Sequence, residues 1–231
     1  MTVRTARRTK AKLDREQVID AALRLADDDD GGLEAISFRR LADQFGVTPM
    51  ALYWHFEDKD ALLGALADRI WSRAAAELEQ GLARTPALDG WGKLRLIAQA
   101  LVDAMRPHPA VAELVPSRVV SCEAGLGVTE LALGLLADEG FDPALAADLA
   151  RFVLSSAVML VSTQAGVEIA DPSERPEHQR RKRIALASLP LDRYPHIIAS
   201  AEHLTDCESP DAWFTRGLDA IIDGVRAQAP S

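Results

Sequence analysis

Residues 37–56, SFRRLADQFGVTPMALYWHF, decide the fold of the first part of the chain. Ser37 is a favourable N-cap residue, because its hydroxyl can accept hydrogen bonds from the free N–H groups of a first helical turn. An apolar stripe at helical spacing comes directly after it, formed by Phe38, Leu41, Ala42 and Phe45. This stretch therefore predicts a short amphipathic helix.

A second helix is expected after a tight turn. Gly46 stands where a helix must end in a left-handed conformation. Thr48 can cap the next helix, and Pro49 occupies its first position, where a missing N–H costs nothing. Two short helices joined by a turn that contains glycine form a helix-turn-helix, whose second helix can enter the major groove of DNA.

The residues of this second helix suit contact with DNA. Leu52 faces inward, and the amphipathic rings of Tyr53, Trp54 and His55 follow it side by side. Tyr and His side chains can donate to phosphate oxygens, and Met50 and Ala51 can contact thymine methyl groups. The spacing alone leaves an alternative open, a small helical bundle whose aromatic rings form its core.

A longer match extends the interpretation. The segments VIDAALRLADDDD, SFRRLADQFGV and MALYWHFEDKDALLGAL lie within residues 13–66, and this region resembles the DNA-binding domain of the tetracycline-repressor (TetR/AcrR) family. The run LYWHFEDKDALLGAL at residues 52–66 is its most specific part. The rest of the chain resembles the family's helical C-terminal domain more loosely, notably at FTRGLDAIIDGV, residues 214–225.

The resemblance implies an all-α protein with an N-terminal three-helix DNA-binding domain and a larger helical bundle for ligand binding and dimerisation. It implies a transcriptional repressor that binds a palindromic operator as a homodimer and is released by a small-molecule effector. The alternative is a helical ligand-binding or structural protein without sequence-specific DNA binding. The residues expected to contact DNA are Arg39, Thr48, Pro49, Met50, Ala51, Tyr53, Trp54, His55 and Lys59.

Charge is distributed unevenly along the 231 residues. The net charge is −9, yet residues 1–13 carry five basic side chains and no acid, so the remainder carries −14. A basic arm ahead of an acidic body fits local contact with DNA. We expect a flexible arm at residues 1–13, a helix-turn-helix domain at 14–60, and an effector-binding and dimerisation domain at 61–231.

Several features favour a cytoplasmic protein. Cys122 and Cys207 are far apart and match no metal-ligand spacing, which suggests a reducing compartment. The N-terminus has no apolar segment typical of a signal peptide. The longest apolar run, residues 152–161, is too short to span a bilayer.

A helix over residues 58–82 is expected to link the two domains, with Asp58 as its cap. Beyond it, the apolar spacing and the prolines predict helices at 91–106, 109–114, 122–139, 143–168, 179–188, 194–203 and 210–228. The polar stretch at 171–183, DPSERPEHQRRKR, is the best candidate for a mobile loop.

Two helices are expected to form the dimer interface, because the resemblance implies a four-helix contact between subunits. The residues assigned to it are Phe152, Ser156, Met159, Phe214, Gly217, Leu218, Ile221 and Val225. Gly217 and Gly224 lie one heptad apart and would allow a partner helix to approach closely. Ordinary intrachain core is the alternative for the same residues.

An effector pocket is also implied by the resemblance. Its expected lining includes Trp91, Met105, His108, Phe152, Met159 and Gln164. No set of histidines could be aligned with the divalent-metal site of the tetracycline repressor, so neither metal nor cofactor is predicted.

An enzyme is not expected. The fragment GLGVTE at residues 125–130 lacks the third glycine of a dinucleotide-binding fingerprint and follows no strand. The chain contains no HExxH motif, phosphate-binding loop, nucleophile elbow or paired-cysteine metal site. His196 and His203 could share a helix face, but no Asp or Cys completes a ligand set.

Overall fold

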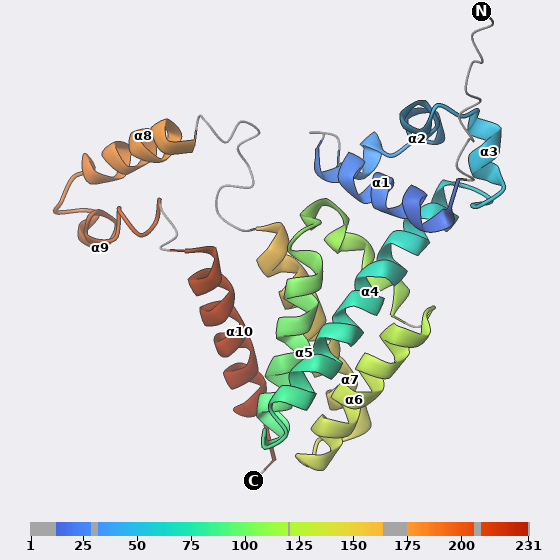
Figure 1. Cartoon of the computed structure of the whole chain (residues 1–231). Helices are drawn as coiled ribbons and strands as arrows, with labels where there is room; N and C mark the ends of the chain where they lie inside the picture. Colours follow the sequence, from blue (N-terminus) through green and yellow to red (C-terminus); the bar gives the residue numbers. More distant parts are fainter. Residues whose placement is uncertain (1–12, 29–31, 120, 164–174, 206–208, 231) are drawn as a thin grey trace, which may run out of the picture. The chain divides into compact units, whose positions relative to one another are not determined.

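A computed structural model describes residues 13–28, 32–119, 121–163, 175–205 and 209–230. These residues form helices and loops and contain no strand (Figure 1). The chain divides into two compact units, Met1–Leu66 and Ala67–Ser231. The all-α prediction is therefore confirmed for the described residues. The expected domain boundary at residue 60 stays a prediction beside this division at Leu66.

The first unit contains α1 (Arg15–Asp27), the 3₁₀ helix η1 (Gly32–Ala35), α2 (Phe38–Phe45) and α3 (Pro49–Tyr53). As predicted, the Ser37 hydroxyl accepts a hydrogen bond from the Arg40 N–H at 3.3 Å and caps α2. Gly46 ends α2 in the left-handed conformation, with φ of 60°. Leu41 and Leu52 are fully buried and hold α2 and α3 on the small core of this unit.

Thr48 differs from its predicted role. It occupies the N-cap position of α3, but its side chain makes no capping hydrogen bond. Pro49 at the first helical position sets a favourable φ and needs no N–H partner, so α3 forms without that cap. The Thr48 hydroxyl is therefore not used in a capping hydrogen bond to α3.

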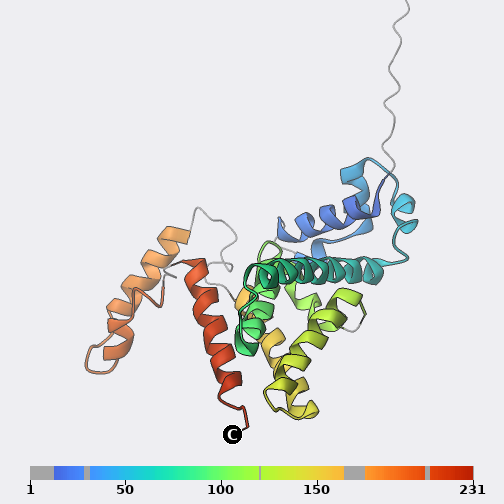
Figure 2. The same ribbon diagram turned by 60° about the horizontal axis from the view of Figure 1, so that its bottom comes forward.

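The linking helix α4 runs from Lys59 to Arg84 and is 26 residues long. Figure 2 shows it as one continuous helix. Asp58 caps it as predicted, since its Oδ1 accepts from the Ala61 N–H at 2.7 Å. The helix ends before Pro86, and its sequence belongs partly to each unit.

The second unit is a helical bundle around α5 (Gly90–Met105), which packs against α6 (Glu123–Asp138), α7 (Pro143–Ser162) and α10 (Pro210–Arg226) (Figure 1). The short 3₁₀ helices η2 (Pro109–Leu114) and η3 (Pro116–Arg118) precede α6, and η2 packs on α7. Nine residues of α5 are buried, which makes it the central helix of this bundle.

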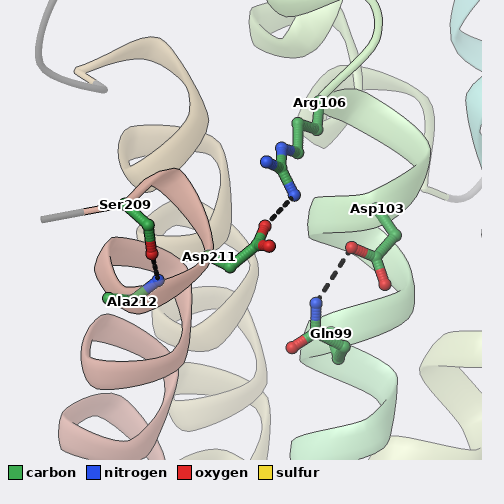
Figure 3. A network of polar contacts seen from close by, with 6 residues as sticks. All are labelled: Gln99, Asp103, Arg106, Ser209, Asp211 and Ala212. Atoms are coloured by element: carbon green, nitrogen blue, oxygen red, sulfur yellow. Dashed lines mark hydrogen bonds and ion pairs between the residues drawn. The ribbon is translucent and has the colours of Figure 1, made fainter.

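Polar contacts join α5 to α10 along their exposed edges. Arg106 Nη1 lies 2.6 Å from Asp211 Oδ1, and Arg95 Nε lies 2.6 Å from Asp219 Oδ1. Figure 3 shows the first of these ion pairs beside the Ser209 hydroxyl, which accepts from the Ala212 N–H and caps α10. The pairs are exposed, so they orient the two helices and contribute little to stability.

The segment after α7 departs from the predictions. The helix α8 (Arg175–Ala187) begins four residues earlier than the expected 179, and α9 (Pro195–Ala199) is shorter than the expected 194–203. Residues 175–183 are therefore helical and not a loop, since the stretch RPEHQRRKR starts with proline near the N-terminus and then holds good helix formers. Residues 171–174 of that expected loop lie outside the described part.

The helix α7 is, among the described residues, long and apolar enough to cross a membrane by length and composition. The apolar run at 152–161, which was predicted to be too short to span a bilayer, is only half of this 20-residue helix. In the structure α7 packs against α5, α6, α10 and η2.

Candidate nucleic-acid interface and ligand cavity

The helix α3 is fixed on α2 by aromatic packing. The rings of Phe38 and Tyr53 meet edge to face, with centroids 4.6 Å apart and an interplanar angle of 64°. The fully buried Leu52 anchors the same helix from its other side. This packing leaves a defined outer face on α3.

That outer face carries the side chains expected to contact DNA. Met50, Tyr53 and Trp54 are 66%, 51% and 86% exposed, and they are among the large apolar side chains that the unit leaves in solvent. Thr48, Pro49 and Arg39 are also exposed, whereas Ala51, His55 and Lys59 are half-buried. Exposed aromatic and apolar side chains cost free energy in water, so this face has the composition of a contact surface.

Two neighbouring arginines on α2 differ in their hydrogen bonding within the unit. Arg40 Nη1 donates to the Ala35 carbonyl at 3.2 Å, so this guanidinium supports the fold of the unit. Arg39 is exposed and stands one position earlier on the helix. The basic arm at residues 1–13 lies almost wholly outside the described part of the chain.

Lys59 begins α4, where the first turn of the helix presents backbone N–H groups. Asp58 Oδ1 accepts a hydrogen bond from one of those groups, the N–H of Ala61. The remaining N–H groups and the Lys59 ammonium can donate to a phosphate, although the Asp58 and Asp60 carboxylates stand on either side of Lys59.

A cavity of about 410 Å³ lies inside the second unit. Its walls come from α4, α5, α6 and α7 and from the segment that contains η3. The lining residues are Trp71, Leu94, Ile97, Leu101, Pro116, Val119, Val128, Thr129, Ala132, Leu133, Ala147, Ala150, Arg151, Val153, Leu154 and Ser155.

Trp71 connects the cavity to α4. Its side chain is 1% exposed and its indole Nε1 donates to the Val115 carbonyl at 3.1 Å. Gly125 allows the close packing beside it, because a Cβ there would lie 2.6 Å from the Val119 carbonyl and 3.3 Å from the Trp71 ring. The ring therefore has a fixed position in the cavity wall.

The residues predicted to line an effector pocket lie elsewhere. Trp91 and Met105 are in the core, His108 is half-buried, and Phe152 and Met159 are 52% and 57% exposed. None of these five lines the cavity, and Gln164 lies outside the described residues. On α7 the cavity-facing side follows the helical steps 147, 150, 151 and 154, which places Phe152 and Met159 on another face.

The sequence signal for the cavity is a set of small residues. Ala132 on α6 and Ala147 and Ala150 on α7 leave space among the four helices that wall the cavity. Trp71, midway along the linking helix, supplies one large wall. Alanines are common in any helical protein, so this pattern alone did not distinguish a cavity from a close packing of helices.

The residues predicted for the dimer interface divide into two groups. Phe152 and Met159 are exposed on α7, and Leu145, which is 36% exposed, continues the same stripe at heptad spacing. Ser156, Phe214, Leu218 and Val225 are buried within the chain, and Ile221 and Gly217 are half-buried. A Cβ on Gly217 would lie 2.5 Å from Leu160 Cδ2, so this glycine allows α10 to approach α7 of the same chain.

Two ionisable groups of the second unit have shifted pKa values. Burial raises the pKa of the Asp103 carboxyl, partly offset by the Gln99 amide, which donates to it at 2.9 Å. Burial also raises the pKa of the Cys122 thiol, whose Sγ accepts from the Gly125 N–H at 3.3 Å. A thiol with a raised pKa is a poor nucleophile at neutral pH. Among the described residues, no cluster of His, Cys, Asp and Glu could hold a metal ion.

Both halves of the chain match family models. Residues 18–66 match the model described as bacterial regulatory proteins, tetR family, and residues 86–229 match the tetracyclin repressor-like C-terminal domain. The tetracycline repressor protein class C of Escherichia coli is 32% identical over 222 residues, covering 93% of this chain and 91% of that protein. The transcriptional repressor DrrR1 of Streptomyces coeruleorubidus is 28% identical, with 96% and 80% covered.

Solved structures show the same fold. ActR of Streptomyces coelicolor, a TetR family protein in complex with (S)-DNPA, is 25% identical and has a TM-score of 0.69, covering 95% of this chain and all of that one. TetR from Acinetobacter baumannii AYE is 27% identical with a TM-score of 0.64, again covering 95% of this chain and 100% of that one. These relatives are regulators of transcription or ligand-binding members of one fold family.

Proposed function

Since this chain belongs to the tetR family of bacterial transcriptional regulators, we propose that it acts in the cytoplasm as a repressor. In this proposal it binds a palindromic operator as a homodimer and leaves the operator when a small molecule enters the cavity of the second unit. The observation that carries the proposal is the exposed face of α3 and its C-cap, where Met50, Tyr53 and Trp54 are in solvent beside the buried anchor Leu52.

On this face each side chain has a distinct task. Thr48 and Met50 would contact base edges in the major groove, because the Thr48 hydroxyl is not used to cap α3 and the Met50 side chain is exposed. Tyr53 and Lys59 would contact phosphates and fix the register of the helix on the duplex. Arg39 on α2 would add a further phosphate contact.

A dimer follows from the limited reach of one helix-turn-helix. One such unit contacts few base pairs, and two units on one face of the duplex lie roughly 34–36 Å apart. The exposed stripe of Leu145, Phe152 and Met159 on α7 supports this assignment, since apolar side chains at heptad spacing suit a paired helix. The α10 residues assigned to the same contact from the sequence stay a prediction.

The coupling between ligand and operator would pass through α4. Trp71 lies in the cavity wall, and the same helix begins at Lys59 in the DNA-binding unit. A ligand that presses on the Trp71 ring, which its hydrogen bond and packing hold in one position, would therefore move α4 and change the separation of the two recognition helices. A differential affinity of ~1–3 kcal/mol between conformers changes operator affinity by roughly 5–150-fold.

The test is a selection of bound sequences from a random duplex library with the ligand-free protein at fixed moderate salt. We expect an inverted repeat with half-sites about one helical turn apart. No enrichment of any sequence would refute the proposal of an operator-binding repressor.

Variants then assign the contacts on the selected operator. Tyr53→Phe and Lys59→Ala should weaken binding to all sequences alike, whereas Thr48→Ala and Met50→Ala should change the preferred bases. Lys182→Ala on α8 is the matched control, because Lys182 is an exposed lysine far along the chain in the second unit. A reversed pattern in mobility-shift assays would contradict the docking of α3.

The dimer is tested by sedimentation equilibrium. Phe152→Asp should convert the dimer to a monomer, because it places a charge in the apolar stripe of α7. Ala144→Asp, at an exposed position of the same helix, should leave the mass unchanged. An unchanged mass for Phe152→Asp would move the interface away from this stripe.

A further inference from the structure

The cavity of the second unit also indicates which class of molecule it binds. We infer that the effector is an uncharged, largely apolar organic molecule that binds without a metal ion, an inference that rests on the proposed function. The argument uses the side chains that line the cavity, their existing partners and the cavity volume.

Among the described residues, the lining offers no His, Cys, Asp or Glu side chain to a divalent metal. The walls contain aliphatic side chains, one indole, two hydroxyls and one guanidinium. Divalent cations in proteins are held by carboxylates, carbonyls, imidazoles or thiolates. A metal–ligand complex would enter this cavity with its charge unbalanced by the described walls, and burying such a charge is costly.

The polar atoms of the lining are few and are partly engaged. The Trp71 indole already donates to the Val115 carbonyl at 3.1 Å. Arg151 forms an ion pair with Asp148 on its own helix, and its side chain is 79% exposed, so its charge remains largely in solvent. The hydroxyls of Thr129 and Ser155 are left to orient a ligand that carries one or two hydrogen-bonding groups.

The volume sets the size of the ligand. A cavity of about 410 Å³ lies within the ~300–1,000 Å³ range of pockets for drug-sized molecules. Its aliphatic walls gain free energy when they displace water with an apolar skeleton. A charged ligand would lose its hydration in this cavity, and Arg151 would compensate little because it is already paired with Asp148. An uncharged ligand avoids this cost.

The test uses N-phenyl-1-naphthylamine, a neutral apolar fluorophore, as the probe of the full-length protein. Its affinity should be the same, within about twofold, with excess EDTA and with MgCl₂. The anionic analogue 1-anilinonaphthalene-8-sulfonate should bind at least about tenfold more weakly. Tetracycline with MgCl₂ should not compete with the neutral probe.

Variants locate the probe. Ala132→Phe fills the cavity from α6 and should weaken binding at least about tenfold, and Ala150→Leu fills it from α7 and should act in the same direction. Ala137→Phe, at an exposed position of α6, is the matched control and should leave the affinity unchanged. Circular dichroism selects the folded variants, and two filling variants on different helices keep the test available if one of them does not fold.

Several results would overturn the inference. One is that the neutral probe fails to bind, or that both filling variants leave its affinity unchanged. A second is that the anionic analogue binds more tightly than the neutral probe. A third is that tetracycline competes with the neutral probe only when MgCl₂ is present. The library selection distinguishes this failure from failure of the proposed function. An enriched operator with no binding of the neutral probe would refute the effector class alone, whereas probe binding without any enriched operator would refute the regulator.

Discussion

Gly217 and Gly224 on α10 allow a sharp test of how this helix packs. They lie one heptad apart on the same helix. The test replaces each of them separately by alanine. A Cβ on Gly217 would meet Leu160 Cδ2 at 2.5 Å and Cδ1 at 3.0 Å, whereas a Cβ on Gly224 meets nothing within 4 Å. The pair therefore separates close packing on α7 from the effect of glycine on the helix itself.

The two effects have known sizes. Replacing glycine by alanine inside a helix stabilises it by ~0.8–1.0 kcal/mol. Overpacking a core contact costs ~1–3 kcal/mol, and Leu160 has little room to move because it is 7% exposed. We therefore expect Gly224→Ala to stabilise the second unit by ~1 kcal/mol and Gly217→Ala to leave it unchanged or destabilise it by up to ~2 kcal/mol.

The measurement is urea unfolding followed by circular dichroism, at two protein concentrations well apart. The expected difference between the two variants is ~1–3 kcal/mol. Equal stabilisation by both substitutions would refute the close approach of α10 to α7. A loss of stability in Gly224→Ala that grows at high concentration would instead place Gly224 against a partner subunit.

Three further outcomes are expected. Asp103→Asn keeps an acceptor for the Gln99 amide and should raise the melting temperature at neutral pH, where the wild-type carboxylate is charged and partly buried. The pKa of Asp103 is raised on folding, so the wild type loses stability as the pH rises through that pKa. The gain should therefore shrink as the pH falls toward 3.8, the ordinary pKa of an Asp carboxyl. Trp71→Phe removes the indole hydrogen bond to the Val115 carbonyl, which still accepts from the Arg118 N–H, and should cost ~0.5–1.5 kcal/mol in urea unfolding; no cost would mean that this hydrogen bond does not hold the ring. Lys59→Ala should reduce the magnitude of the slope of log K against log salt on the selected operator by ~0.9, as expected for one lost phosphate contact, and an unchanged slope would remove Lys59 from the interface.

Local residues were sufficient for the caps of α2 and α4 and for the turn between α2 and α3. Ser37 and Gly46 act through backbone groups only a few residues away, so their roles could be predicted and are confirmed. Asp58 caps α4 for the same reason. Thr48 did not follow, because Pro49 at the first helical position lets α3 start without a side-chain cap.

Contacts between helices required the tertiary structure. The periodicity of α7 identified an apolar helix, but the same residue types serve as core, cavity wall or exposed stripe, depending on the neighbours at each face. Phe152 and Met159 face solvent while Ala150 and Leu154 line the cavity, only because α5 and α6 pack on one side of α7.

The sequence by itself determined an all-helical chain and the helix-turn-helix, because capping, turn chemistry and helical periodicity act over a few residues. The tertiary structure decided where the cavity lies, which residues line it and which apolar faces stay exposed. Those properties depend on how side chains from α4, α5, α6 and α7 meet across long sequence separations, and no local pattern specifies that meeting.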